Sequence, residues 1–359
     1  MNLHLVGGFL GSGKTTTITQ AALLLLDAGQ RVGIVTNDQG RYLVDTAFAQ
    51  RLSLPTVEVT GGCFCCNYGQ LEAQLHALQA TAQPDVIFAE SVGSCADIVA
   101  TVVKPFQQLS NLPDLALTSF SVLVDARLLR RTLAGQPLPF SEDVVYIFGQ
   151  QIEEAGLLVI NKADLLSPAQ QTELRRAAVR AYPHKTILLQ SATRPADLQN
   201  WLDQLGAPWP RRSLALDYGR YGAGEAQLAW LNEALHLHSA SVPLTRVART
   251  LVLALLDRIK ATGGQIGHLK LLLEAGPAHH KLSFTAEPAP DWEAQLADLP
   301  GHGARVLVNA RVECPVEALE DALTLALVDT TARTGATYRR EQREAFHPAF
   351  PRPTHRIGN

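Results

Sequence analysis

The stretch GGFLGSGKTT, residues 7–16, decides how the first half of this chain folds. It fits the spacing G-x-x-x-x-G-K-[ST], and it lies between a short apolar run and a helix-like run, as this motif requires. Backbone N–H groups of such a loop bind phosphates, its lysine adds a positive charge, and its threonine hydroxyl can bind Mg²⁺. The predicted residues of this phosphate loop are Gly8, Gly11, Ser12, Gly13, Lys14, Thr15 and Thr16.

Short apolar runs recur along the following two hundred residues, separated by helix-like stretches. Strands that are buried on both faces of a sheet have this nearly continuous apolar, β-branched composition. We therefore predict an α/β fold: a three-layer P-loop NTPase domain with a mostly parallel sheet, over residues 1–207. Its predicted strands are residues 3–6, 31–37, 55–60, 85–90, 120–126, 156–164 and 185–192.

The Pro-rich bridge at residues 206–213 marks a change in composition. Beyond it, strand-like and helix-like runs follow in the order β-α-β-β-β-α, which predicts a smaller α+β domain over residues 213–334. Residues 335–359 are rich in Arg, Pro and His and have no apolar period, so we expect a mobile tail.

Composition excludes some classes of partner. The formal net charge of -3 gives no electrostatic basis for binding nucleic acid, which normally needs a basic face. The sequence contains neither a signal peptide pattern nor an apolar run long enough to cross a membrane. We therefore expect a cytoplasmic protein, without membrane or nucleic-acid partners, in which thiols stay reduced.

The sequence NKAD points to the base of the nucleotide. Asn161, Lys162 and Asp164 follow a predicted strand, where a carboxylate can accept hydrogen bonds from guanine N1–H and the N2 amino group. Adenine offers neither donor and would leave Asp164 unpaired, so the motif favours GTP and disfavours an ATP-dependent kinase. The alternative for NKAD is a simple helix cap. The residues that end the next strand resemble the base-contacting loop of GTPases; they are Ser191, Ala192 and Thr193.

Three of the five cysteines lie together at Cys63, Cys65 and Cys66. A C-x-C-C spacing does not by itself complete a closed structural zinc site, which normally combines two separated ligand pairs. It leaves an open thiolate site, suited to a soft or borderline ion such as Zn²⁺ or Cu(I). Asp38 and Cys95 are the candidates for additional ligands. The alternatives are a redox-active dithiol or buried small residues.

The motifs GGFLGSGKTT, GGCFCC, ESVG and NKAD, in this order, resemble those of the CobW-like metallochaperone GTPases, relatives of UreG and HypB. The resemblance covers roughly the first two hundred residues. It implies that Glu90 lies near Mg²⁺ in the Walker-B role and that Gly93 is a hinge that senses the γ-phosphate. The chain departs from the family's VNEFGE switch segment, because TNDQGR places Asp38 and Arg41 where the family has glutamates.

Together these features predict a GTP-binding, GTP-hydrolysing metallochaperone that couples the nucleotide cycle to transfer of a metal, zinc above all, to a client metalloprotein. Lys14, Asp38 and Glu90 are the predicted catalytic residues, and Asp38 or Glu90 would orient the attacking water. A homodimer that depends on nucleotide or metal is compatible with this prediction. The alternative is a metal-independent, GTP-regulated protein-binding module whose cysteine cluster senses redox state.

Overall fold

The computed structural model describes residues 1–41, 43–112, 114–209, 211–288 and 292–359. It divides into two compact units. The first unit contains residues 1–39, 49–224 and 350–359, and the second contains residues 40–48 and 225–349.

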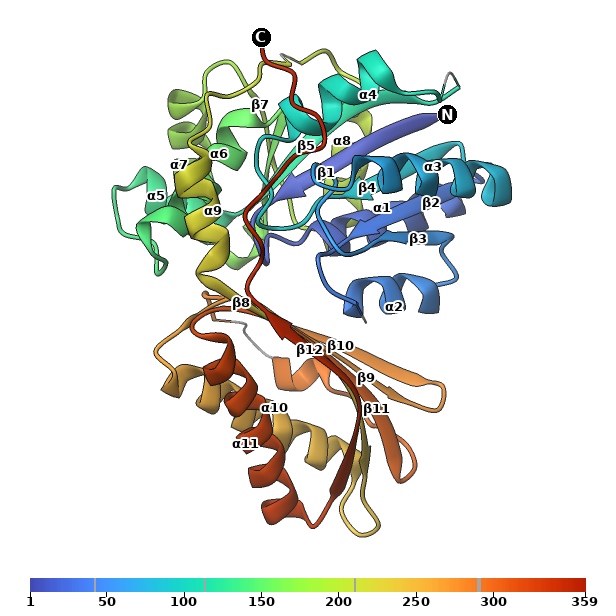
Figure 1. Ribbon diagram of the computed structural model, residues 1–359, viewed down its shortest axis with the longest axis vertical. Helices are drawn as coiled ribbons and strands as arrows, with labels where there is room; N and C mark the ends of the chain where they lie inside the picture. The colour runs from blue at the N-terminus through green and yellow to red at the C-terminus, as the bar shows by residue number, and fades with distance from the viewer. Residues whose placement is uncertain (42, 113, 210, 289–291) are drawn as a thin grey trace. The chain divides into compact units, whose positions relative to one another are not determined.

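The first unit contains a seven-stranded sheet with the strand order β3-β2-β4-β1-β5-β6-β7 (Figure 1). All its strand pairs are parallel. Its central strands are buried along their whole length, which explains their nearly continuous apolar sequence. The strands are β1 (Asn2–Gly8), β2 (Val32–Asn37), β3 (Thr56–Val59), β4 (Val86–Glu90), β5 (Ala116–Asp125), β6 (Leu157–Asn161) and β7 (Thr186–Leu189). This sheet confirms the predicted α/β class.

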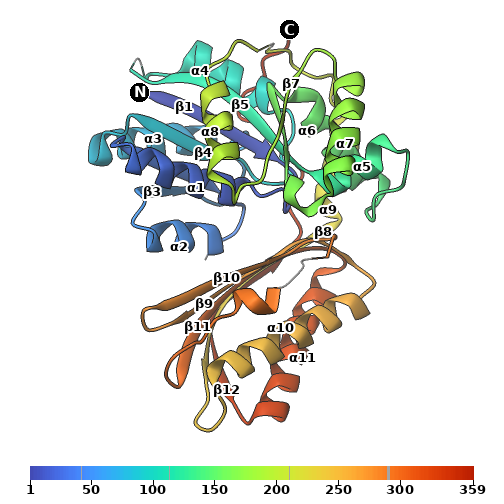
Figure 2. The ribbon, with the colours of Figure 1, turned by 180° about the vertical axis from the view of Figure 1, so that it is seen from behind.

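Helices cover both faces of this sheet. Helix α1 (Lys14–Asp27) and helix α8 (Pro195–Gln204) share a core with the strands on one face, where Trp201 stacks on Phe88 (Figure 2). From β3 onward the chain steps across the sheet in the direction opposite to the step from β1 to β2, and the right-handed crossover rule then puts the helices between these later strands on the other face of the sheet. The remaining helical segments of this unit are α3 (Tyr68–Ala82), η1 (Val99–Val103), α4 (Lys104–Leu109), α5 (Ala126–Leu133), α6 (Glu142–Glu154), η2 (Ala163–Leu165), α7 (Pro168–Ala181) and α9 (Tyr218–Ala226), the last of which ends across the boundary.

The second unit is a five-stranded antiparallel sheet with the order β10-β9-β11-β8-β12. Leucines and valines of the sheet form one core with α10 (Leu244–Ala261) and α11 (Val316–Thr334). The predicted β-α-β-β-β-α order is confirmed. The strands are β8 (Leu228–His238), β9 (Gln265–Ala275), β10 (Ala278–Phe284), β11 (Gly303–Glu313) and β12 (Thr337–Phe346), and a short helix η3 (Trp292–Gln295) precedes β11.

Residues 335–359 differ from the mobile tail that the sequence suggested. Thr337–Phe346 forms edge strand β12, paired with β8, and residues 350–359 belong to the first unit. The charged run in this strand lacks an apolar period because it pairs with a buried carboxylate: Arg340 Nε lies 2.8 Å from Glu233, whose side chain is fully buried. The prediction looked for an apolar period, so it missed a strand whose side chains form ion pairs instead.

The second unit also contains a segment from the first half of the chain. Residues 40–48 include the first part of α2 (Val44–Arg51), which packs on the strands through Val44 and Phe48. The Val44 amide donates to Asn309 Oδ1 at 2.7 Å, and Asp45 forms ion pairs with Lys270 and Lys281. The segment that follows Asp38 is thus anchored in the second unit, beyond the domain limits that composition suggested.

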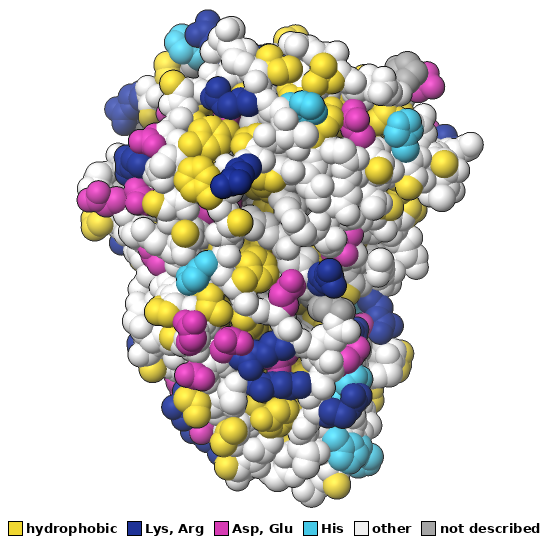
Figure 3. Space-filling view, viewed as in Figure 1, with side chains coloured by type: hydrophobic (Ala, Val, Ile, Leu, Met, Phe, Trp, Pro, Cys, Tyr) yellow, Lys and Arg dark blue, Asp and Glu magenta, His cyan; other side chains and the backbone are white. Residues whose placement is uncertain are grey.

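The surface agrees with a charge balance close to neutral. Acidic and basic side chains lie interspersed on the face drawn in Figure 3, in keeping with the net charge of -3. Across the ranges that the structure describes, the helices are too short or too polar to cross a membrane.

Candidate nucleotide and metal site

The phosphate loop joins the end of β1 to the start of α1. Gly13 has φ 93°, and a side chain there would collide with the Asn161 amide, so the loop needs glycine at this position. Lys14 Nζ donates to Gly8 O at 2.8 Å and to Phe9 O at 3.3 Å, which places the ammonium over the loop. These contacts preform the anion-binding geometry that the sequence predicts.

A polar atom in this loop has no protein partner. Ser12 Oγ is buried, and none of the described residues bonds to it. A buried hydroxyl normally finds a hydrogen-bond partner. Its position beside the loop amides suits an oxygen-rich ligand, so the residues present fit phosphate groups.

Thr15, in the first turn of α1, contacts Glu90, the last residue of β4. Thr15 Oγ1 donates to the two carboxylate oxygens of Glu90 at 3.0 and 2.8 Å, and both residues are buried. The register that pairs Val6 with Glu90 brings the carboxylate to the phosphate loop. A hydroxyl and a carboxylate are oxygen ligands of the kind that Mg²⁺ prefers, so this pair fits the ion that the sequence predicts there.

Asn161 connects the phosphate loop to the two predicted base loops. Its Nδ2 donates to Ser12 O at 2.8 Å, and its Oδ1 accepts the Ala192 amide at 3.1 Å. Asp164 follows in η2 with an exposed side chain. The hydroxyls of Ser191 and Thr193 lie 2.9 Å apart in the loop after β7. The structure thus brings the NKAD and SAT segments to one edge of the sheet.

Lys162 has a partner that the sequence analysis missed. Its backbone is left-handed, with φ 60°, and its Nζ lies 3.1 Å from Asp125 Oδ2. Burial alone would raise the pKa of Asp125, but hydrogen bonding to Arg127 and the Lys162 charge outweigh it and lower that pKa. Asp125 ends a predicted strand at the ligand-binding edge, and this position is the signal that could have identified it.

The three clustered cysteines point their sulfur atoms at one another. Cys63 Sγ lies 2.7 Å from Cys65 Sγ, which in turn lies 3.7 Å from Cys66 Sγ. A tight turn holds them, because the amides of Cys66 and Asn67 both donate to Cys63 O, at 3.0 and 2.9 Å. We call residues 60–67 the cysteine loop. Cys63 and Cys65 are buried and Cys66 is half-buried, so the cluster opens to solvent on the Cys66 side.

Cys95 lies beside this cluster, but neither Cys95 nor Asp38 belongs to the group of metal-ligand residues. The Cys95 thiol hydrogen-bonds with both Cys63 and Cys65. Among the described parts of the chain, only the three loop cysteines form a group of at least three metal-ligand residues whose ligand atoms all lie within 4.8 Å of one another. Asp38 is outside that group; its amide donates to Val59 O at 3.2 Å.

The pKa values of the three loop thiols shift in opposite directions. Hydrogen bonds from Cys65, Cys66 and Cys95 hold the pKa of Cys63 well below its usual value. The hydrogen bond to Cys63 raises the pKa of Cys65 well above its usual value and, together with burial, raises the pKa of Cys66 to about 11. Neighbouring thiols thus favour the thiolate form of Cys63 over that of Cys65 and Cys66, and a thiolate is the form in which cysteine binds a metal.

Asn37 attaches the cysteine loop to β2, a contact that the sequence analysis missed. Its Nδ2 donates to Val59 O at 3.0 Å and to Gly62 O at 2.8 Å, and its Oδ1 accepts the Phe64 amide at 2.9 Å. Asn37 is buried and immediately precedes Asp38. A polar residue that ends a buried strand was the available signal.

Gln151 supports the loop after β4. This buried residue of α6 donates from Nε2 to Gly93 O at 3.0 Å and to Cys95 O at 2.8 Å. A side chain at Gly93 would contact Leu10 too closely, so the loop packs directly on the phosphate loop. The predicted hinge therefore lies between the phosphate loop and Cys95.

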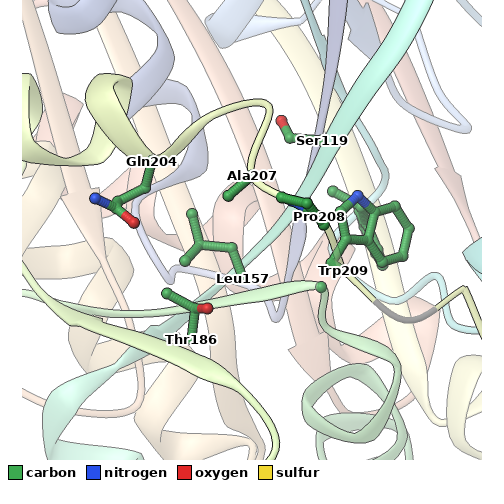
Figure 4. Close-up of a pocket in the computed structure, with 9 residues that line it drawn as sticks. Ser119, Leu157, Thr186, Gln204, Ala207, Pro208 and Trp209 are labelled. Carbon is green, nitrogen blue, oxygen red and sulfur yellow. The ribbon is translucent and has the colours of Figure 1, made fainter.

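A small pocket lies at the other end of the sheet. Leu157 and Thr186 begin strands β6 and β7, and Trp209 closes the pocket beside them (Figure 4). It has room for roughly one water molecule. It is therefore too small for a nucleotide and too far along the strands to belong to the loops at their carboxyl ends.

Comparison with known proteins gives a consistent family assignment. Residues 2–189 match the family model of the CobW/HypB/UreG nucleotide-binding domain. The chain is 27% identical to the zinc chaperone YeiR of Escherichia coli over 176 residues, 48% of this chain and 50% of that one. It is 25% identical to the zinc chaperone CobW of a Sinorhizobium species over 186 residues, 45% of this chain and 50% of that one.

A solved structure shows a weaker similarity. The Zn(II)-bound YjiA GTPase from E. coli is 14% identical, with a TM-score of 0.37, over 91% of this chain and 98% of that one. The matched part of the chain spans about half the length of the curated relatives.

Proposed function

Because the chain belongs to the CobW/HypB/UreG family, we propose that it binds and hydrolyses GTP and uses this cycle to deliver a zinc ion to a client protein. The observation that carries the proposal is the meeting of three thiols, Cys63, Cys65 and Cys66, at the edge of the sheet that holds the phosphate loop. The thiol of Cys95 lies beside them. The name "zinc chaperone" of two relatives supports zinc as the ion delivered. A cytoplasmic location remains part of the proposal.

Phosphates would be bound by the loop amides and by Lys14, whose ammonium already lies over the loop. Thr15 and Glu90 would hold Mg²⁺, which offsets negative charge on the outer phosphates when bound. Glu90 is engaged with Thr15, so we assign the orientation of the attacking water to Asp38. Lys14 then stabilises the charge that develops on the γ-phosphoryl group.

Guanine would be selected by Asp164. Its exposed carboxylate can accept hydrogen bonds from guanine N1–H and the N2 amino group, which adenine cannot supply. Asn161 positions the loops around the base, and Lys162 is held by Asp125. The backbone of the loop Ser191–Thr193 would complete the base site.

Zinc would be bound by thiolates. The three loop thiols form an open set of sulfur ligands that zinc accepts, Cys95 is the candidate for a fourth, and the half-buried Cys66 gives the ion a route out of the cluster. Zinc bound in this way is cargo, because the protein must release it to the client. A homodimer formed in one nucleotide or metal state could contribute to the transfer.

Equilibrium dialysis with zinc under reducing conditions tests the proposal. The wild-type protein should bind zinc stoichiometrically, and the triple variant Cys63→Ala, Cys65→Ala, Cys66→Ala should lose this binding. Persistent stoichiometric binding in the triple variant would show that the site lies elsewhere. GTP hydrolysis, followed as phosphate release, should continue in the triple variant, because its phosphate loop is unchanged.

A second candidate function rests on the 2.7 Å approach of Cys63 and Cys65 and on the low pKa of Cys63. A thiolate beside a thiol is the arrangement of a redox-active pair. In that case the protein would be a GTP-regulated binding module, and the cysteines would sense oxidants. Absence of zinc binding in the fully reduced protein, together with rapid reversible oxidation of this pair, would favour it.

A further inference from the structure

Residues 350–359 lie against the cysteine loop, although the sequence separates them from it by almost the whole chain (Figure 1). The Thr354 amide donates to Cys65 O at 2.8 Å, and its hydroxyl donates to Cys66 O at 3.1 Å. The Arg352 amide donates to the sulfur of Cys66 at 3.3 Å. The segment therefore bonds to both the backbone and the thiol on the open side of the cluster.

The same segment also holds the loop that follows β4. Arg356 Nε lies 2.7 Å from Asp97 Oδ2, and Asp97 is almost fully buried. The Ile357 amide donates to Ala100 O at 2.9 Å. Asp97 has φ 67°, a strained conformation for a residue other than glycine, and it lies in the loop that begins at Gly93. Arg356 thus compensates a buried charge in the loop that carries Cys95.

Further contacts fix the segment on either side of these bonds. The His355 ring packs edge-on against Tyr68, the first residue of α3, with centroids 5.2 Å apart. Lys104 Nζ donates to Gly358 O at 2.7 Å. The segment has no helix or strand of its own, so its order comes from these contacts with the two loops and their neighbours.

We propose that residues 350–359 form a strap that joins the cysteine loop to the loop after Gly93 and slows exchange of the metal ion held by the thiols. The inference rests on the proposed zinc function and adds its regulation. Cys66 is the half-exposed thiol, and the strap lies on it, so an ion leaves or enters only when the strap moves. A nucleotide-dependent shift of the Gly93–Asp97 loop would act on the strap through Arg356.

The strap offers a matched pair of arginines for the test. Arg356→Ala removes the ion pair with Asp97, whereas Arg352→Ala removes an exposed side chain and keeps the backbone amide that bonds to Cys66. Both variants change the net charge equally. Thr354→Pro removes the amide that donates to Cys65 O, and Thr354→Val removes only the hydroxyl.

Zinc release into excess chromophoric chelator should be measured for each zinc-loaded protein by stopped flow. We expect release to accelerate by about fivefold or more in Arg356→Ala and Thr354→Pro, since each loses at least one hydrogen bond that closes the strap. Thr354→Val should show a smaller acceleration, and Arg352→Ala should release zinc at the wild-type rate. Equal rates in all five proteins would overturn the strap.

A second readout separates the strap from the zinc proposal. Alkylation of Cys66 by iodoacetamide in the metal-free, reduced protein, followed by mass spectrometry, reports exposure of this thiol without any metal. The strap predicts faster alkylation in Arg356→Ala and Thr354→Pro than in Arg352→Ala. Faster alkylation without zinc binding would contradict the proposed function alone, whereas unchanged alkylation would contradict the strap. Circular dichroism should confirm that each variant is folded.

Discussion

The side-chain oxygen of Asn37 accepts the backbone N–H of Phe64 at 2.9 Å, and its Nδ2 donates to Gly62 O at 2.8 Å. One buried side chain thereby fixes the cysteine loop to the end of β2. The next residue is Asp38, which we assign to the attacking water. A nucleotide that moves Asp38 must therefore also act on the backbone around Cys63, which gives the two sites a physical connection.

Asn37→Ala should uncouple these sites. The variant loses three hydrogen bonds to the cysteine loop and the strand before it, so zinc affinity should become nearly independent of the nucleotide. Asn67→Ala is the matched control, because the Asn67 side chain donates to Thr60 O and Gln70 Oε1 and does not link the loop to β2 in these bonds, while its backbone bond to Cys63 O is kept. A competing chelator measures the zinc affinity of each protein, with and without a GTP analogue. Full coupling in Asn37→Ala would show that the connection runs elsewhere.

Asp164→Asn should change the base that the protein prefers. The amide can no longer accept both guanine donors, so GTP affinity should fall by about 10- to 100-fold. Xanthine nucleotides should gain affinity, since their additional carbonyl can accept a hydrogen bond from the new amide. Titration of GTP, XTP and ATP into both proteins measures this exchange. Equal affinity of the wild-type protein for GTP and ATP would reject the assignment of Asp164.

Lys14→Ala should nearly abolish hydrolysis while the fold persists. The ammonium donates to the carbonyls of Gly8 and Phe9 in the phosphate loop, and in the proposed mechanism it stabilises charge that develops on the phosphates. Wild-type turnover without a partner should be slow, about 10⁻³ to 10⁻² per second, and the variant should lose about 100-fold or more. Phosphate release measures the rate, and a thermal unfolding curve checks the fold. Unchanged turnover would remove Lys14 from the mechanism.

The sequence predicted the sheet because its signals are local. Seven apolar runs became seven parallel strands, and the motifs of Lys14 and Asp164 lie directly after strands β1 and β6, as their spacing suggested. Strand ends of a parallel sheet converge, so the nearness of Glu90 to Thr15 follows from topology.

Contacts made across long sequence separations could not be predicted in this way. Nothing near Arg356 in the sequence indicates Asp97, and the amide of Thr354 carries no signal for Cys65. Asp45 resembles an ordinary residue of a helix start, but its partners, Lys270 and Lys281, lie on strands of the second unit. Such pairs depend on the folded arrangement, so composition placed the domain limits and the tail incorrectly.

Asp45→Asn should reduce stability at neutral pH and flatten its dependence on acid. Burial would raise the pKa of Asp45, but the charges of Lys270 and Lys281 outweigh it and hold that pKa well below the usual value. A lowered folded pKa adds stability that is fully present above the unfolded value of about 4 and is lost as pH falls through the folded value.

The wild-type thermal midpoint should therefore fall more steeply below about pH 4 than that of Asp45→Asn. At pH 7 the variant should be less stable by about 2 kcal/mol, because two largely buried lysines lose their carboxylate. Thermal unfolding of both full-length proteins from pH 3 to pH 7 measures this difference. Parallel curves with the same offset at every pH would contradict the ionic role of Asp45.

The central claim is that one chain couples a GTP site to a zinc site, and a thermodynamic cycle tests it most directly. Zinc affinity should be measured with a competing chelator in the nucleotide-free, GDP and non-hydrolysable GTP states, in the wild type and in Cys65→Ala. Linkage requires zinc to change GTP affinity by the same factor by which GTP changes zinc affinity. We expect a change of about 5- to 150-fold between nucleotide states in the wild type, which corresponds to about 1–3 kcal/mol of coupling. Identical wild-type zinc affinities in all three states would contradict the account and leave two sites that only share a chain.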